Sequence, residues 1–133
     1  MSRENLELRA VADAAFGAIN SGDLDAFLAL IADDVEFTSL VAEAEAVTFR
    51  GHSGVRVWWE TVRGAFESVH WELIGTRDAG DRGVSQFRMS GVLSGVPLEQ
   101  MMWQALKFRG DKVIWWAIFR TEQEALEAVG LRE

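Results

Sequence analysis

The sequence predicts a single α+β domain in which a curved β-sheet packs against helices. Two observations support this fold class: apolar residues recur at helical spacing near the N-terminus, and later segments alternate with the period of a strand. A further observation that supports this fold class is the stretch from Met101 to Phe119, in which two apolar runs of strand length flank Gly110 and Asp111. This pattern is typical of a β-hairpin, and since neither run alternates with polar residues, we expect both faces to be covered.

The beginning of the chain predicts an antiparallel pair of helices. An apolar stripe indicates a first helix over about 4–19, which Asn20-Ser21-Gly22 ends. Asp23 is placed to cap a second, short helix that is expected to end at Asp33-Asp34.

The rest of the chain predicts strands with one more helix between them and one after them. Two short strands are expected over 35–41 and 46–50, a third helix from Gly51 to about Ser68, and two longer strands over 69–78 and 86–93. The segment Gly95-Val96-Pro97 is expected to turn the chain back into the hairpin. The segment from Thr121 to Glu124 has the form of a capping box, and it predicts a short final helix that stops at Gly130.

Length and composition limit the domain count and the partners. With 133 residues, the chain is expected to form one domain over 1–133. A net charge of −8 without a basic cluster argues against nucleic acid and anionic membranes as partners. With no cysteine and only two histidines, neither a metal nor a cofactor is expected. A polar N-terminus and the lack of a membrane-spanning apolar run predict a cytoplasmic protein.

Four short motifs suggest a family. They are NSGDLD at 20–25, IADDV at 31–35, FRGH at 49–52 and FRGDKV at 108–113. Together with the order of the elements, they resemble the SnoaL-like branch of the nuclear-transport-factor-like superfamily, which includes polyketide cyclase, ketosteroid isomerase and limonene epoxide hydrolase relatives. The resemblance covers almost the whole chain. It implies a cone-shaped, mixed sheet of about six strands wrapped around the helical pair and the third helix, with a short C-terminal helix.

The resemblance also allows a test for known catalytic groups. Ketosteroid isomerase uses a carboxylate base with a tyrosine and a protonated aspartate, and the corresponding positions here are Ser39, Ala15 and Gln104. None of the three groups is present, so this mechanism is not expected. The Asp-Arg-Asp arrangement of the epoxide hydrolases is not found either. An isomerase, cyclase or hydratase activity is therefore left without an assigned catalytic residue.

Gln104 is the most informative polar residue, because an amide in an apolar strand must find partners once it is buried. It would hold a ligand carbonyl, or it would bond a neighbouring side chain or water, or it would face outward. Ser39 would at most donate a hydrogen bond to the same space. The resemblance places Arg120 on the inner face, where it would pair with a ligand carboxylate or with Glu45. On the outer face, Arg120 would be a solvated charge.

The apolar residues expected on the inner face would line either a pocket or a packed core. Because indole rings are hard to pack without voids, we predict a ligand-sized cavity for a small hydrophobic molecule. The candidate ligand-binding residues are Phe37, Ser39, Trp58, Trp59, Phe87, Met89, Met102, Gln104, Trp116 and Arg120.

The outer face of the hairpin predicts a second subunit. Met101, Trp103, Trp115 and Ala117 would form an apolar patch that is rarely left in water, so we expect a homodimer through it. Three functions remain open: an enzyme for a non-polar substrate, a non-catalytic carrier of a hydrophobic or amphipathic molecule, and an interaction module. Ligand binding is the favoured function.

Overall fold

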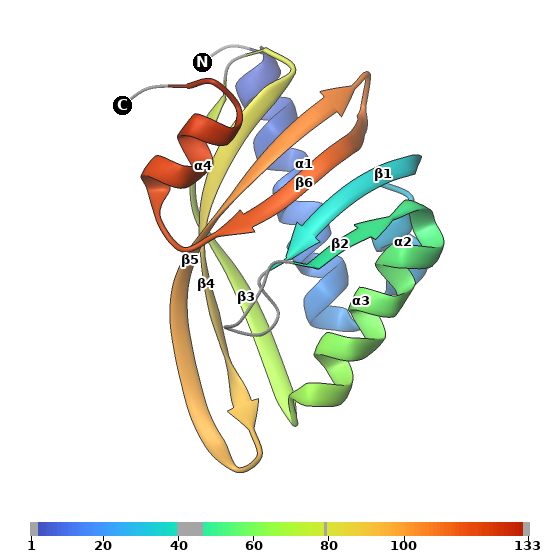
Figure 1. Cartoon of the computed structure of the whole chain (residues 1–133), viewed down its shortest axis with the longest axis vertical. Coiled ribbons are helices and arrows are strands. Elements are labelled where there is room, and N and C mark those ends of the chain that lie inside the picture. The colour runs from blue at the N-terminus through green and yellow to red at the C-terminus, as the bar shows by residue number, and fades with distance from the viewer. Residues whose placement is uncertain (1–2, 40–46, 79, 132–133) are drawn as a thin grey trace.

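The computed structural model describes residues 3–39, 47–78 and 80–131 (Figure 1). None of the helices in these ranges is long and apolar enough to span a membrane. The elements are α1 (Arg3–Ser21), α2 (Leu24–Leu28), β1 (Ile31–Ser39), β2 (Val47–Arg50), α3 (Gly51–Ala65), β3 (Ser68–Asp78), β4 (Arg82–Leu93), β5 (Val96–Arg109), β6 (Lys112–Phe119) and α4 (Glu122–Ala128).

The strands form one mixed sheet in the order β2-β1-β6-β5-β4-β3. The pairing of β1 with β6 is parallel, and the other neighbours are antiparallel. The sheet does not close on itself, because β2 and β3 remain at its two edges (Figure 1). The predicted α+β fold with a six-stranded mixed sheet is therefore confirmed.

Helices α1, α2 and α3 cover one face of the sheet, which we call the inner face (Figure 1). Helix α1 packs along β3, and α3 packs against β1 and β2. Apolar side chains from these helices and from the strands form one large core. Alternation along β6 directs Trp116 and Ile118 into this core.

The C-terminal end of α1 is fixed to its neighbours by hydrogen bonds. The Asn20 side chain donates to the carbonyl oxygen of Trp71 and accepts from the Trp71 amide, both at 2.8 Å. It thereby takes the place of a neighbouring strand at the edge of the sheet. The Arg63 guanidinium from α3 donates to the carbonyl oxygen of Ile19 at 3.2 Å, which ties α1 to a second helix.

Helix α4 covers part of the opposite, outer face (Figure 1). Its Ala125 and Leu126 pack with Val84 and Ala105 in a second apolar core, whose partly buried members include Trp103, Trp115 and Phe119. The predicted capping box is present: Thr121 Oγ1 accepts from the Glu124 amide at 3.2 Å. The chain itself therefore covers part of the surface that was expected to meet a second subunit.

Two predicted boundaries are wrong. Helix α2 ends at Leu28 instead of Asp33-Asp34, and β1 begins at Ile31 instead of Val35. The reason is tertiary pairing: Ile31 lies opposite Val113 of β6, and this parallel pairing outweighs a local helical pattern. A register shift between Ile31 and Glu36 lets the two aspartates face solvent within the strand.

Two other boundaries also differ from the prediction. Helix α3 ends at Ala65, and Phe66 is already extended. Strand β5 begins at Val96, because the turn before it consists of Ser94 and Gly95, which both have positive φ. Pro97 then pairs with Val92 inside the sheet instead of forming the turn.

Candidate ligand-binding site

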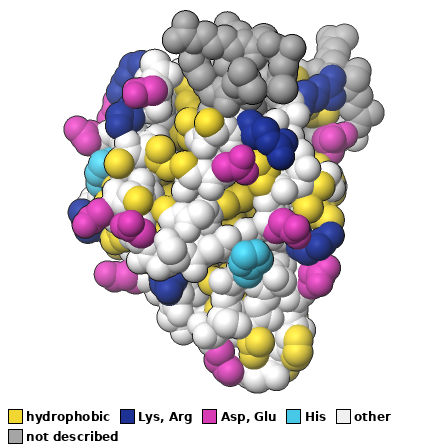
Figure 2. Space-filling model, turned by 180° about the vertical axis from the view of Figure 1, so that it is seen from behind, with side chains coloured by type: hydrophobic (Ala, Val, Ile, Leu, Met, Phe, Trp, Pro, Cys, Tyr) yellow, Lys and Arg dark blue, Asp and Glu magenta, His cyan; other side chains and the backbone are white. Residues whose placement is uncertain are grey.

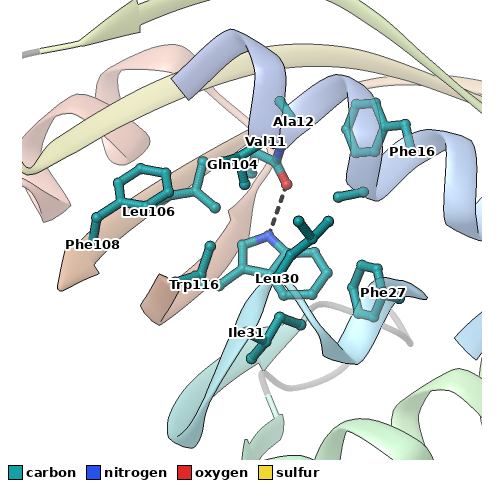
Figure 3. A pocket seen from close by; sticks show the side chains of 12 residues that line it. Val11, Ala12, Phe16, Phe27, Leu30, Ile31, Gln104, Leu106, Phe108 and Trp116 are labelled. Carbon is teal, nitrogen blue, oxygen red and sulfur yellow. Dashed lines mark hydrogen bonds between the residues drawn. The ribbon is translucent and has the colours of Figure 1, made fainter. Parts of the chain in front are cut away.

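Gln104 on β5 and Trp116 on β6 form a buried polar contact on the inner face (Figure 3). The Trp116 indole Nε1 donates to Gln104 Oε1 at 2.7 Å. Since an indole nitrogen can only donate, the amide oxygen must face Trp116, and this fixes the orientation of the amide. Gln104 is 2% exposed, and its Nε2 donates no hydrogen bond to any residue that the structure describes. The NH₂ group is therefore left with unused donor capacity.

A small cavity lies beside this contact (Figure 3). Its described walls come from α1, from the α2–β1 junction and from β5 and β6, and among these described residues Gln104 is the single one with a polar side chain apart from the Trp116 indole. Its volume of about 20 Å³ has room for about one water molecule. The lining consists of Val11, Ala12, Ala15, Phe16, Phe27, Leu30, Ile31, Gln104, Leu106, Phe108, Val113 and Trp116.

Aromatic rings fill the inner face next to the cavity. Phe37 stacks on Trp116, with ring centroids 3.8 Å apart, and Trp58 meets both rings edge-on. Further along, Trp71 stacks on Phe87 at 4.9 Å. These contacts are typical of a close-packed aromatic core.

The structure places the sequence-predicted residues in four settings. Gln104 and Trp116 line the cavity, together with Ala15, the position that corresponds to the tyrosine of the isomerase. Phe37, Trp58, Phe87 and Met102 are buried in the inner core, and Met89 packs against it while partly exposed. Trp59 lies against Phe27 and under Arg63. Arg120 is exposed after the end of β6. The side chain of Ser39 and all of Glu45 lie outside the described residues.

Ser85 is a buried polar residue that the sequence analysis did not single out. It is 0% exposed, and it lies opposite Gln104 in the pairing of β4 with β5. It therefore shares the inner face with Gln104. Its Oγ has no hydrogen-bond partner within residues 3–39, 47–78 and 80–131. The alternation that placed Phe87 inward also places Ser85 inward, and this signal was missed because the strand was expected to begin at 86.

Ionisable side chains stay at the surface of the described part of the chain. Ser85 and Gln104 are the buried polar residues there, and no carboxylate, histidine or basic group is buried. Figure 2 shows acidic and basic side chains interspersed over one face of the molecule. In the same residues no group of three His, Asp or Glu comes together to hold a metal.

One ion pair that shifts the pKa values of both its members lies at the end of the hairpin formed by β5 and β6. The Arg109 guanidinium donates two hydrogen bonds to the Asp34 carboxylate, at 2.9 and 3.3 Å. These bonds lower the pKa of Asp34 and raise that of Arg109. Both side chains are exposed, so the pair joins the hairpin to β1 without belonging to the site.

The fold and the site together define an open mixed-sheet cone with an apolar cavity and one buried amide in its wall. The sequence model of the SnoaL-like domain matches residues 12–116, which is most of the 133-residue chain. The chain belongs to the SnoaL-like domain family. No curated protein matches the sequence.

Solved structures share the fold at low sequence identity. A hypothetical protein with a ketosteroid isomerase-like fold from Catenulispora acidiphila, in complex with trimethylamine, is 21% identical with a TM-score of 0.74, covering 92% of this chain and 93% of its own. A putative polyketide cyclase from Sinorhizobium meliloti is 18% identical with a TM-score of 0.68, covering 82% and 93%. An LEH-like epoxide hydrolase from M. tuberculosis is 11% identical with a TM-score of 0.72, covering 93% and 90%.

Proposed function

We propose that the protein binds a small, neutral, hydrophobic or amphipathic molecule in the cavity beneath α1. The observation that carries this proposal is the Gln104 amide, which is buried, oriented by Trp116 and left with free N–H donors beside an apolar cavity. A carbonyl or ether oxygen of a ligand would accept a hydrogen bond from Nε2, while its hydrocarbon part would contact the apolar walls. A charged ligand is disfavoured, because none of the described lining residues is an ionisable group that could pair with it.

This arrangement supports binding more directly than catalysis. A neutral amide donates a hydrogen bond, but it does not exchange a proton with a substrate at neutral pH. Among the lining residues that the structure describes, none is an acid, a base or a nucleophile. An isomerase, cyclase or hydratase activity, the kind of chemistry suggested by the family relatives, would need an acid or base from outside the lining.

Binding of anything larger than water requires one wall of the cavity to move. Helix α1 is the best candidate, because its contribution to the lining consists of apolar contacts through Val11, Ala12, Ala15 and Phe16. Its hydrogen bonds through Asn20 and to Arg63 lie beyond these residues, at the C-terminal end of the helix. We therefore expect α1 to pivot about this end, so that the part of the helix over the cavity moves away from the sheet when a ligand enters.

Thermal-shift and native-mass measurements with steroids, terpenes, polyketides and fatty acids test the proposal. The best binder is then compared between the wild type and Gln104→Met, which keeps the volume but removes the N–H donors together with the oxygen that accepts from Trp116. Loss of the donors should weaken binding by about 10- to 100-fold. Gln100→Met is the matched control, because Gln100 is an exposed amide on the same strand. The proposal fails if no class stabilises the protein or if Gln104→Met binds as tightly as the wild type.

A homodimeric carrier or interaction module is the second candidate. It is favoured by Met101, which is 36% exposed on β5, and by Trp103 and Trp115, which stay partly exposed beside α4. Ala117 is buried in the monomer, so a partner would contact the other three residues. If this surface forms the dimer, Trp103→Glu and Met101→Glu should both yield a monomer in light scattering. An unchanged mass for both variants would rule out this interface.

A further inference from the structure

One side of the cavity wall reaches the surface of the molecule. Val11, Ala15, Leu30 and Phe108 are partly exposed, whereas the other lining residues that the structure describes are buried. Val11 and Ala15 are four residues apart on α1, so their side chains lie on the same side of the helix. The four residues therefore define the mouth of the cavity, and Gln104, which is 2% exposed, lies beneath it.

Opposite α1, the mouth is bordered by segments that are bonded to one another. Phe108 at the end of β5 pairs with Val113 of β6, and the Val113 amide donates to the carbonyl oxygen of Leu30 at 3.1 Å. The ion pair of Arg109 with Asp34 connects the same segments. Helix α1 contributes only apolar side chains to the described lining. We therefore expect the mouth to open between α1 and this border, where apolar contacts alone have to be given up.

Phe108 has the least constrained ring in the cavity wall, and it lies at one end of the group of lining residues (Figure 3). Phe16 and Phe27 pack on rings of the inner core, with centroids 5.4–6.0 Å apart, but Phe108 contacts no other aromatic ring among the described residues. Its backbone is held in place, because its amide donates to the carbonyl oxygen of Asp81 at 2.7 Å. The Phe108 side chain can therefore rotate without a change in the strand.

The mouth lies at the beginning of β1, whereas Ser39, the position of the isomerase base, ends that strand. Since β1 has nine residues, its two ends lie roughly 25 Å apart. Between them, Phe37 stacks on Trp116 at 3.8 Å and Trp58 meets both rings edge-on. A route to the cavity from the Ser39 end would have to displace this stack, whereas a route through the mouth displaces one partly exposed ring.

Resting on the proposed function, we propose that Phe108 is the gate of the binding site and that the ligand enters between α1 and the β5–β6 hairpin, away from Ser39. The ring closes the mouth, and its rotation, together with the pivoting of α1, admits a molecule to Gln104. The two residues then have separate tasks: Phe108 controls the rates of entry and exit, and Gln104 contributes to affinity.

Hydrogen exchange of the Trp116 indole N–H measures the opening of the gate without a ligand, because this group lies in the cavity wall and is bonded to Gln104. In ¹⁵N-labelled protein, Phe108→Ala should speed this exchange by roughly tenfold. The Trp58 indole N–H is the internal reference, because Trp58 is 1% exposed and lies outside the cavity wall. Phe108→Leu should have a smaller effect in the same direction if the alanine variant does not fold.

The matched control is Phe49→Ala. Phe49 is also a partly exposed ring, but it lies on β2, stacks on Phe37 at 6.0 Å and does not line the cavity. Its removal should leave the exchange of Trp116 relative to Trp58 unchanged. The gate is ruled out if Phe108→Ala speeds both indoles equally, or if Phe49→Ala affects Trp116 as much as Phe108→Ala does.

A removable plug tests whether a molecule uses this mouth. Because the chain has no cysteine, Leu30→Cys gives a single thiol at the mouth, to which benzyl methanethiosulfonate adds a benzyl group that dithiothreitol removes. The probe is 4-(dimethylamino)benzonitrile, a neutral one-ring molecule with a nitrile acceptor and a polarity-sensitive fluorescence. The plug should abolish its uptake, and dithiothreitol should restore it. Phe49→Cys with the same benzyl group should take up the probe at the wild-type rate.

The failures of the two proposals are distinguishable. If the wild type takes up the probe, but neither the plug slows uptake nor Phe108→Ala speeds the exchange of Trp116, the gate is wrong and the proposed function stands. If the wild type binds neither the probe nor any class of the ligand screen, the proposed function and the gate are both contradicted.

Discussion

The two faces of β5 and β6 both carry aromatic rings, but the outer face also has small residues at the place where a helix covers it. The inner face presents large rings, such as Trp116 stacked on Phe37, with the Gln104 amide among them. The outer face presents Ala105 and Ala117, which are 0% and 2% exposed and leave room for α4 to lie close to the sheet. The rings of the inner face therefore build a core with a cavity, whereas the two alanines between the rings of the outer face let a helix pack closely against the sheet.

If this difference decides stability, the largest effect should come from removing a ring from the inner face. Trp116→Ala removes the stacking on Phe37 and leaves Gln104 Oε1 without its donor, so we expect a loss of about 3–5 kcal/mol in the free energy of unfolding. Urea denaturation followed by circular dichroism measures it. Trp116→Leu gives a smaller loss in the same direction if the alanine variant is not folded.

The neighbouring indole on the outer face provides the control for that experiment. Trp115 is partly exposed, and Lys107 Nζ lies 4.9 Å from its ring centroid. Trp115→Ala should therefore cost only about 1–2 kcal/mol. Equal losses for Trp115→Ala and Trp116→Ala would show that the two faces contribute alike and would contradict the comparison.

A smaller loss in the free energy of unfolding is expected when the N-terminal cap of α4 on the outer face is removed. Thr121→Ala removes the cap that accepts from the Glu124 amide, and this should cost about 1 kcal/mol. Amide exchange should become faster in α4, while ligand binding on the inner face stays unchanged. Gln123→Ala is the matched control, because Gln123 is exposed and bonds only to Glu127 among the described residues. A change in ligand affinity with Thr121→Ala would show that the two faces are coupled.

The sequence predicted the parts of the fold that local patterns determine. Alternation in β6 separated Trp116 from Trp115, and the capping box marked the beginning of α4 at Thr121. The boundary between α2 and β1 was wrong, because Ile31 satisfies a helical stripe as well as a strand, and only its pairing with Val113 decides between them. The position of α4 on the outer face was not predicted either, because a helical pattern does not indicate which face of a sheet the helix will cover.

The candidate site, like the fold, was predicted in part. Gln104 stood out because an amide interrupts an apolar strand, and the structure places it in the wall of the cavity. Ser85 was missed because serine is common in loops and the beginning of its strand was misjudged. The walls contributed by Val11 and Ala12 have the pattern of ordinary helix core, so only the tertiary packing of α1 over β5 and β6 reveals the cavity.

The smallest expected effect on stability comes from the exposed ion pair of Asp34 with Arg109, which joins β1 to the end of the hairpin. The hydrogen bonds from Arg109 hold the pKa of Asp34 below its ordinary value of 3.8. The stabilisation is therefore fully present above about pH 3.8 and is lost as the pH falls through the lowered pKa of the folded state. Asp34→Asn should be slightly less stable than the wild type at pH 7, and the difference should disappear at low pH. Carboxyl NMR titration checks the cause, since Arg109→Gln should return the pKa of Asp34 to its usual range. An unchanged titration in that variant would assign the shift to another group.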